Sequence, residues 1–203
     1  MPATETPAVA AVVLAAGSST RMGQNKLFLD IGGQTLVRRA VRASALARLA
    51  PVIVVLGHEA DRVRAELAGL PCLPVVNPDH ARGAGTSLQV GVARAATEAL
   101  ALVVVLADMP FVTASMLETL VERYRKSGAP LVVSRYGEVE APPNLFDRSL
   151  FAELLLTDGE RGAKQVVRRH KHEAVVAAWP EQALRDIDVP SDYEDIRAHL
   201  APR

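Results

Sequence analysis

The sequence predicts an α/β fold with a Rossmann-like, doubly wound and mostly parallel sheet, because short valine-rich segments alternate with segments of helical periodicity. The short segments are almost continuous in apolar residues, which is typical of strands buried on both faces. They cover residues 9–14, 52–56, 72–76, 102–106, 131–133 and 174–177. Segments with a helical period cover residues 34–49, 60–68, 86–99, 114–126, 150–155, 162–170 and 191–200. Strand–helix–strand repetition implies right-handed βαβ units.

One region interrupts this alternation. Residues 136–146 contain Gly137 and the pair Pro142-Pro143, which predict either an antiparallel excursion or a second lobe. The chain has 203 residues, no internal repeat and no low-complexity linker. We therefore expect a single domain over residues 1–203, with residues 1–8 flexible.

Composition excludes several classes of function. The 23 Lys and Arg balance 23 Asp and Glu, so the chain lacks the basic excess of a protein that binds a nucleic acid polymer. Its one cysteine, Cys72, allows neither an intramolecular disulfide nor a Cys-rich metal site. The start of the chain does not resemble a signal peptide, and the longest apolar run is about half of the roughly 20 residues that a membrane helix needs. We expect a cytoplasmic protein with no membrane partner.

In doubly wound folds, ligands bind beyond the carboxyl ends of the strands. The residues there are Ala15-Ala16-Gly17, Gly57-His58, Asn77-Pro78-Asp79-His80 and Asp108-Met109-Pro110. The two histidines fall in the predicted crevice, although a structural role is at least as plausible for each.

The segment after the first strand has the composition of a phosphate-binding loop. Small residues around Gly17 let backbone N–H groups approach an anion, while Arg21 and Lys26 supply the two cation types that suit a polyphosphate. The spacing matches neither a Walker A loop nor a G-x-G-x-x-G dinucleotide fingerprint. A surface loop with two solvated cations is the alternative.

Two acidic segments are candidate metal ligands. Asp108 ends a buried strand and suits Mg²⁺ when phosphate oxygens complete the shell, although it could instead be a turn residue before the next helix. One carboxylate of Asp186-Ile187-Asp188 could meet Asp108 on the same ion; the alternative is a solvent-facing acidic tail.

Taken together, these residues resemble the MobA-like nucleotidyltransferases. Residues 14–26 read Leu-Ala-Ala-Gly-x-Ser-x-Arg-Met-Gly-x-x-Lys, which is similar to the signature of that family. Asp108-Met109-Pro110 resembles its metal-binding Asp-Met-Pro, and residues 186–190 resemble its Asp-x-Asp-x-Pro. The stretch from Asn77 to Gly91 resembles its nucleotide-contacting segment. Residues 143–146 and 158–164 resemble a block typical of the molybdenum cofactor cytidylyltransferase branch, with departures at Ala107, Asn144 and Glu160.

The resemblance implies a nucleotide-diphospho-sugar-transferase-like fold and a Mg²⁺-dependent enzyme that moves CMP from CTP to the terminal phosphate of molybdopterin, releasing pyrophosphate. It implies that Arg21 and Lys26 are catalytic, that Asp108 and Asp188 hold the metal, and that Arg161 and Lys164 contact the acceptor. The nucleotide-binding residues that it implies are Leu14, Ala15, Ala16, Gly17, Arg21, Lys26, Asn77, Gly85, Ser87 and Asp108.

The choice of base and of acceptor leaves alternatives. Ala16 adds a methyl group where a purine would need room, which favours CTP over GTP. A guanylyltransferase, a cytidylyltransferase for another phosphorylated acceptor, and a non-catalytic chaperone that delivers the cofactor to a molybdenum hydroxylase are the rivals. The basic segment 161–172 could bind acceptor phosphate or could be a solvated helix face.

Overall fold

The computed structural model describes residues 8–19, 22–157, 159, 162–185, 187 and 190–200, with the backbone alone for residues 190 and 197–200. The expectation of a flexible segment at residues 1–8 falls almost wholly on residues 1–7, which lie outside this description.

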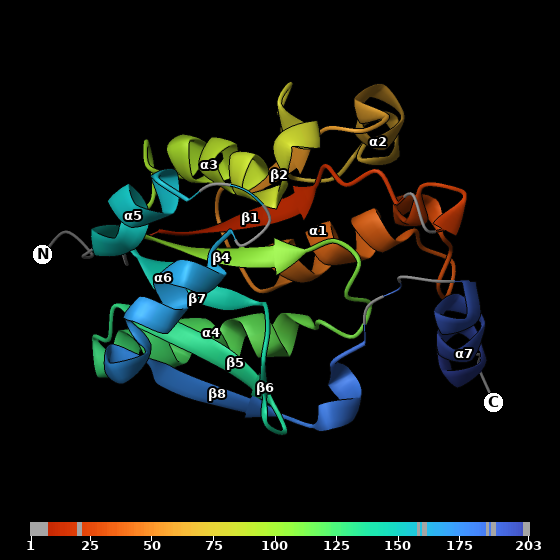
Figure 1. The fold of residues 1–203 in the computed structure, drawn as a ribbon. Coiled ribbons are helices and arrows are strands. Elements are labelled where there is room, and N and C mark those ends of the chain that lie inside the picture. Colours follow the sequence, from red (N-terminus) through yellow and green to blue (C-terminus); the bar gives the residue numbers. More distant parts are fainter. Residues whose placement is uncertain are drawn as a thin grey trace, which may run out of the picture.

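The described strands form one sheet in the order β3-β2-β1-β4-β7-β5-β6, with β8 also paired to β5 (Figure 1). The strands are β1 (Val9–Ala15), β2 (Val52–Leu56), β3 (Leu73–Val76), β4 (Ala101–Leu106), β5 (Leu131–Tyr136), β6 (Val139–Glu140), β7 (Asn144–Asp147) and β8 (Val175–Trp179). The helices are α1 (Leu36–Leu46), α2 (Ala60–Glu66), α3 (Ala84–Ala95), α4 (Ala114–Ser127), α5 (Phe151–Leu155), α6 (Lys164–Arg169) and α7 (Pro190–Leu200). This architecture confirms the predicted fold class.

The interruption at residues 136–146 is an antiparallel excursion within the same sheet and not a second lobe. β6 forms a hairpin with β5, and β7 returns antiparallel between β4 and β5. The Asn144 side chain accepts a hydrogen bond from Ser134 N (2.9 Å), beyond the last paired residues of the two strands. The asparagine that departs from the family pattern therefore joins β7 to β5.

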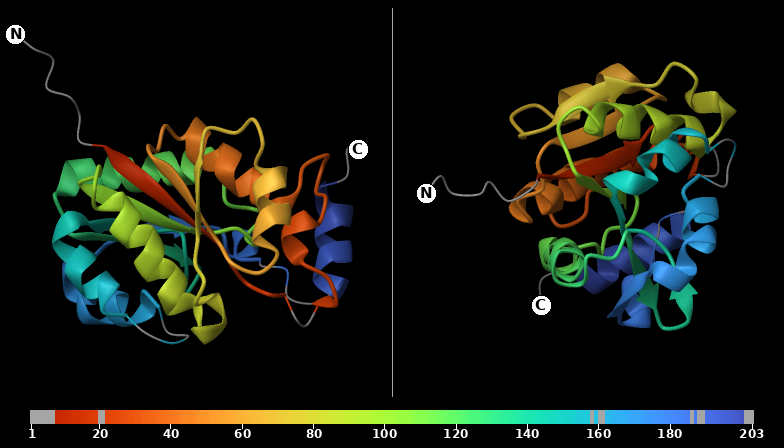
Figure 2. Two further views of the ribbon diagram at one scale, coloured as in Figure 1. Left: turned by 90° about the horizontal axis from the view of Figure 1, so that it is seen from above. Right: turned by 90° about the vertical axis from the view of Figure 1, so that its left-hand side faces the viewer.

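The sheet is buried on both faces because its strands alternate between two cores. On β1, Val9, Ala11 and Val13 pack with α1, α2 and α4, whereas Ala10 and Val12 pack with α3, α5 and α6. The right-hand view of Figure 2 shows the two helical layers on opposite sides of the sheet. This double burial explains the nearly continuous apolar runs in the sequence.

The two outer strands are exceptions. We predicted that residues 72–76 and 174–177 are buried on both faces, but three of the four β3 residues are exposed and β8 is only partly covered. Each of these strands has a single paired neighbour, β2 for β3 and β5 for β8, so each is an edge strand. Apolar content alone does not distinguish an edge strand from a central one.

Helix α7 packs at the end of the sheet toward which β1 and β4 point (Figure 1). A separate small core joins it to the loop after β1: Ile187 and Ile196 pack with Met22, Leu29 and Ile31. The Tyr193 hydroxyl donates to the carbonyl oxygen of Asp30 (2.9 Å). The C-terminal segment is thus fixed beside the loop that follows β1.

No helix within the described residues is long and apolar enough to cross a membrane.

We predict that Gly91→Ala destabilises the protein by about 1–3 kcal/mol, because overpacking a close helix–sheet contact forces side chains to shift. A Cβ at Gly91 would lie 2.3 Å from Val12 Cγ1 and 3.1 Å from Val55 Cγ2. Urea unfolding measures the loss. The matched control is Gly17→Ala, whose Cβ has no atom within 4 Å; equal stability of the two variants would contradict the packing argument.

Candidate functional site

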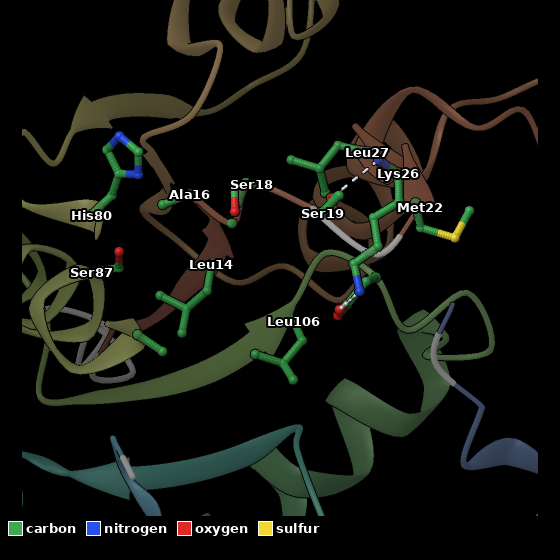
Figure 3. A pocket seen from close by; sticks show the side chains of 14 residues that line it. Leu14, Ala16, Ser18, Ser19, Met22, Lys26, Leu27, His80, Ser87 and Leu106 are labelled. Atoms are coloured by element: carbon green, nitrogen blue, oxygen red, sulfur yellow. Dashed lines mark hydrogen bonds and ion pairs between the residues drawn. The ribbon is translucent and has the colours of Figure 1, made fainter. Parts of the chain in front are cut away.

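A cavity of about 360 Å³ opens at the carboxyl ends of β1 and β4, where the sequence predicts the ligand crevice. Its lining residues are Leu14, Ala15, Ala16, Gly17, Ser18, Ser19, Met22, Lys26, Leu27, His80, Ala84, Ser87, Leu106 and Asp108. Figure 3 shows that the cavity has two unlike ends. Lys26, Ser19, Met22 and Leu27 lie at one end, and His80, Ala16 and Ser87 lie at the other.

An ion pair marks the first end. Lys26 Nζ lies 2.7 Å from Asp108 Oδ2, and these side chains are 15% and 23% exposed. The surface pair Lys126–Glu122 is equally short at 2.6 Å, but its side chains are 74% and 60% exposed. Because water screens the cavity pair less, its charges interact more strongly. Asp108 is the one carboxylate that lines the cavity among the described residues.

The loop after β1 holds Lys26 in place through local hydrogen bonds. Ser19 has a φ of +50°, which turns the chain back, and its side-chain oxygen accepts from Lys26 N (3.2 Å). Asn25 caps the short helix Lys26–Phe28 by accepting from Leu27 N (3.1 Å), and the Leu27 side chain is buried. The lysine is therefore anchored on both sides of its own position.

A buried asparagine organises the entry to α3. Asn77, at the end of β3, is 2% exposed and donates to Thr86 Oγ1 and Ser87 Oγ, both at 2.9 Å. Its side-chain oxygen accepts from Asp79 N (3.0 Å). With these bonds made, Asn77 positions Ser87, which lines the cavity, but does not line it itself.

Gly57, at the end of β2, permits a close contact behind the second end of the cavity. A Cβ at this position would lie 2.6 Å from both Cβ and Cγ of His80 and 2.8 Å from Ala16 Cβ. Only glycine lets His80 and Ala16 occupy these places. His58, the next residue, does not line the cavity; its ring lies 3.8 Å from the Glu59 carboxylate.

The structure distributes the predicted site residues as follows. Seven of the predicted nucleotide-binding residues line the cavity: Leu14, Ala15, Ala16, Gly17, Lys26, Ser87 and Asp108. Asn77 and Gly85 are buried behind it. The predictions at Arg21, Arg161, Asp186 and Asp188 fall outside the described residues. Ile187 is described, and it packs in the same small core as the cavity-lining Met22.

The predicted acceptor side lies next to the nucleotide-side loop, and none of its described residues lines the cavity. A Cβ on Gly83 would be 2.9 Å from the carbonyl carbon of Gly159, so the two loops are in contact. Lys164 begins α6, is exposed and does not line the cavity.

Much of the basic segment 161–172 is neutralised within the protein. Arg169 and His170 both pair with Glu153, and Lys171 pairs with Glu140 (2.8 Å). Hydrogen bonds with Glu153 and Glu173 raise the pKa of His170. Among the described residues, no cluster of three or more His, Cys, Asp or Glu could hold a metal ion there or elsewhere.

Sequence reasoning did not assign seven of the lining residues to the site: Ser18, Ser19, Met22, Leu27, His80, Ala84 and Leu106. For His80 a signal was present, because it follows a strand end. Ser19 and Met22 had a signal too, because both belong to the family signature at residues 14–26. Ser18, Leu27, Ala84 and Leu106 line the cavity through tertiary packing or through the path of the loop, for which the sequence offers no specific signal.

Fold and cavity define an α/β protein with a cavity at the carboxyl edge of its sheet, which is where doubly wound proteins bind ligands. A model of the MobA-like NTP transferase domain matches residues 11–175. The chain therefore belongs to the MobA-like nucleotidyltransferase family.

Individual proteins agree with this assignment. Purine catabolism protein PucB of Bacillus subtilis is 31% identical over 96% of this chain and 98% of its own length. Bifunctional protein GlmU of Anaeromyxobacter dehalogenans is 31% identical over 82% of this chain, which spans only 36% of that protein. The crystal structure of Rv0371c from Mycobacterium tuberculosis has a TM-score of 0.82 at 28% identity, covering 95% of this chain and 98% of its own. A second structure of Rv0371c is a complex with manganese, with a TM-score of 0.77 at 26% identity and coverage of 95% and 99%.

We predict that Asn77→Ala weakens NTP binding roughly tenfold, because the loop that carries Ser87 must then be ordered by the ligand. It also removes about 1–3 kcal/mol of stability through lost buried hydrogen bonds. Isothermal titration and urea unfolding measure the two effects. Ser44→Ala, which is equally buried but lies on α1 and bonds to Ala40 O, is the control. If both variants bind NTP alike, Asn77 has no positioning role.

Proposed function

We propose that this nucleotidyltransferase is a Mg²⁺-dependent cytidylyltransferase that moves CMP from CTP to the terminal phosphate of a molybdopterin-type acceptor. The observation that carries the proposal is the Lys26–Asp108 pair at one end of a cavity whose other end has no Asp, Glu, Lys or Arg among its described lining residues. A nucleoside triphosphate has the same polarity, with a charged tail and a neutral base.

The reaction joins an acceptor phosphate oxygen to the α-phosphorus of CTP and breaks the bond from that phosphorus to the bridging oxygen of the β-phosphate. Pyrophosphate leaves with the electron pair of the broken bond. Such a transfer needs positioning and charge stabilisation and no covalent nucleophile. The Lys26 ammonium supplies positive charge at the end of the cavity where the phosphates would lie. Backbone N–H groups around Gly17, which lines the same cavity, would supply hydrogen-bond donors.

The donor set suits Mg²⁺. This ion is usually bound through one or two carboxylates together with substrate phosphate oxygens, and Asp108 provides a carboxylate inside the cavity. Asp188 would be the second carboxylate and Arg21 a second cation, as the family resemblance implies. When bound, the metal would offset the charge of the triphosphate. Lys26, already beside Asp108, then places its ammonium next to the phosphates.

The preference for CTP rests on Ala16. Its methyl group lines the uncharged end of the cavity, so a single-ring base fits there with less displacement than a purine. GTP remains the rival nucleotide.

The proposal of a molybdopterin-type acceptor rests on two observations. Residues 143–146 and 158–164 resemble the molybdenum cofactor cytidylyltransferase branch. The contact between Gly159 and Gly83 also brings this block next to the nucleotide-side loop. Arg161 and Lys164 would contact the acceptor phosphate. A different phosphorylated acceptor, and a chaperone that delivers the cofactor to a molybdenum hydroxylase, are the rival proposals. We further propose a single domain that acts in the cytoplasm.

The direct test incubates the protein with molybdopterin, Mg²⁺ and each α-labelled NTP, and measures pyrophosphate and labelled product. We expect turnover with CTP. Turnover with GTP alone would overturn the base assignment, and turnover with other phosphorylated acceptors alone would overturn molybdopterin. Cofactor binding without turnover of any NTP would favour the chaperone.

We predict that Asp108→Asn lowers kcat by roughly 100-fold or more while the protein stays folded, because the variant keeps the shape but loses the charge that pairs with Lys26 and holds the metal. The matched control is Glu122→Gln, which removes the carboxylate of the exposed pair with Lys126 and is expected to leave activity unchanged. Equal activity of the two variants would remove Asp108 from the reaction.

We predict that Ala16→Gly lowers the ratio of kcat/KM for CTP to that for GTP by about tenfold, because it removes the methyl group that narrows the base end. Steady-state rates with each NTP measure the ratio. If the ratio does not move, the steric argument at Ala16 is wrong.

A further inference from the structure

His80 is the one titratable side chain at the uncharged end of the cavity among the described residues. It begins the short helix His80–Arg82 after β3 and is half-buried. Figure 3 shows its imidazole beside Ala16 and Ser87, away from Lys26. Within the part of the chain that the structure describes, its ring nitrogens have no hydrogen-bond or ion-pair partner, so both can bind a ligand.

The Cβ and Cγ atoms of His80 are closely packed against Gly57. The Cβ and Cγ of His80 lie so close to Gly57 that a Cβ there would approach each to 2.6 Å. The same imagined Cβ would lie 2.8 Å from Ala16 Cβ, so Gly57 backs both residues. Since the missing side chain of Gly57 creates the place that His80 fills, the imidazole forms a fixed wall and not a free surface group.

We propose that His80 determines base specificity: with Ala16 it limits the width of the base end, and its ring nitrogens contact the polar edge of the base. This inference rests on the proposed function, because it assumes that a nucleobase occupies this end. It adds a residue that contacts the base and an explanation for the glycine behind it.

The chemistry of the imidazole suits the polar edge of a pyrimidine. Each ring nitrogen is either an N–H donor or an acceptor, depending on the tautomer. Cytosine presents an amino donor next to a ring-nitrogen acceptor, and uracil presents a carbonyl acceptor next to an N–H donor, so a ring nitrogen can pair with either base. The contact therefore adds affinity for both pyrimidines, whereas the width of the base end discriminates against the purine.

The test measures dissociation constants of CTP, UTP and GTP for the full chain with Mg²⁺, by isothermal titration and without acceptor. For His80→Ala we expect the ratio of the dissociation constant of GTP to that of CTP to fall by about tenfold, because the side chain that limits the width of the base end is removed. For His80→Phe, which keeps a ring without nitrogens, we expect CTP and UTP to bind about tenfold more weakly with their ratio unchanged, and GTP to gain no affinity.

Two further variants separate this role from a structural one. His58→Ala removes the neighbouring histidine that does not line the cavity, and it is expected to leave all three ratios unchanged. Gly57→Ala should push His80 and Ala16 toward the cavity, narrow the base end and lower the affinity for GTP relative to CTP, which is the direction opposite to that of His80→Ala. If this variant does not fold, the two His80 variants still test the inference.

The outcomes are distinguishable. Unchanged dissociation constants in both His80 variants overturn this inference and leave the proposed transfer intact. A gain of GTP over CTP in His80→Ala, with no loss of pyrimidine affinity in His80→Phe, supports the steric role of His80 and overturns the contact by the ring nitrogens. Shifted ratios with no transfer to molybdopterin support His80 and overturn the proposed acceptor. Failure of the unmodified protein to bind any NTP overturns both.

Discussion

The ion pair between Lys26 and Asp108 is the interaction on which the rest of the site depends. It joins the loop after β1 to the end of β4, two central strands that pair in parallel with Leu14 opposite Leu106. Parallel pairing brings both carboxyl ends to one edge, so residues 82 positions apart meet at 2.7 Å. The pair concentrates charge at one end of the cavity.

Several residues that look unrelated in the sequence share one role, which is to order the loop that carries Lys26. Ser19 and Asn25 bond the backbone on either side of Lys26, and Leu27 is buried beside it. Ile196 of α7 packs in the same small core as Met22, which precedes Lys26 in this loop. Each contact removes freedom from a loop whose lysine would otherwise lose conformational entropy on binding.

Sequence reasoning predicted the central strands and the cavity edge because double burial leaves a continuous apolar run, as on β1. It could not place β3 and β8 at the edges, because edge position depends on which strands pair. Nor could it separate His80 from His58, since both follow strand ends; the small size of Gly57 decides which of them faces the cavity. Asn77 was predicted to bind the nucleotide, but its burial and its bonds to Thr86 and Ser87 arise only when the start of α3 lies beside the end of β3.

The two ends of the cavity would contribute differently to nucleotide recognition. Every NTP carries the same triphosphate, so contacts near Lys26 and Asp108 would add affinity without choosing among bases. Choice must come from the other end, where His80 and Ala16 are backed by the missing side chain of Gly57. Specificity in this protein would therefore change through small substitutions around Gly57 that leave the charged end, and with it the chemistry, untouched.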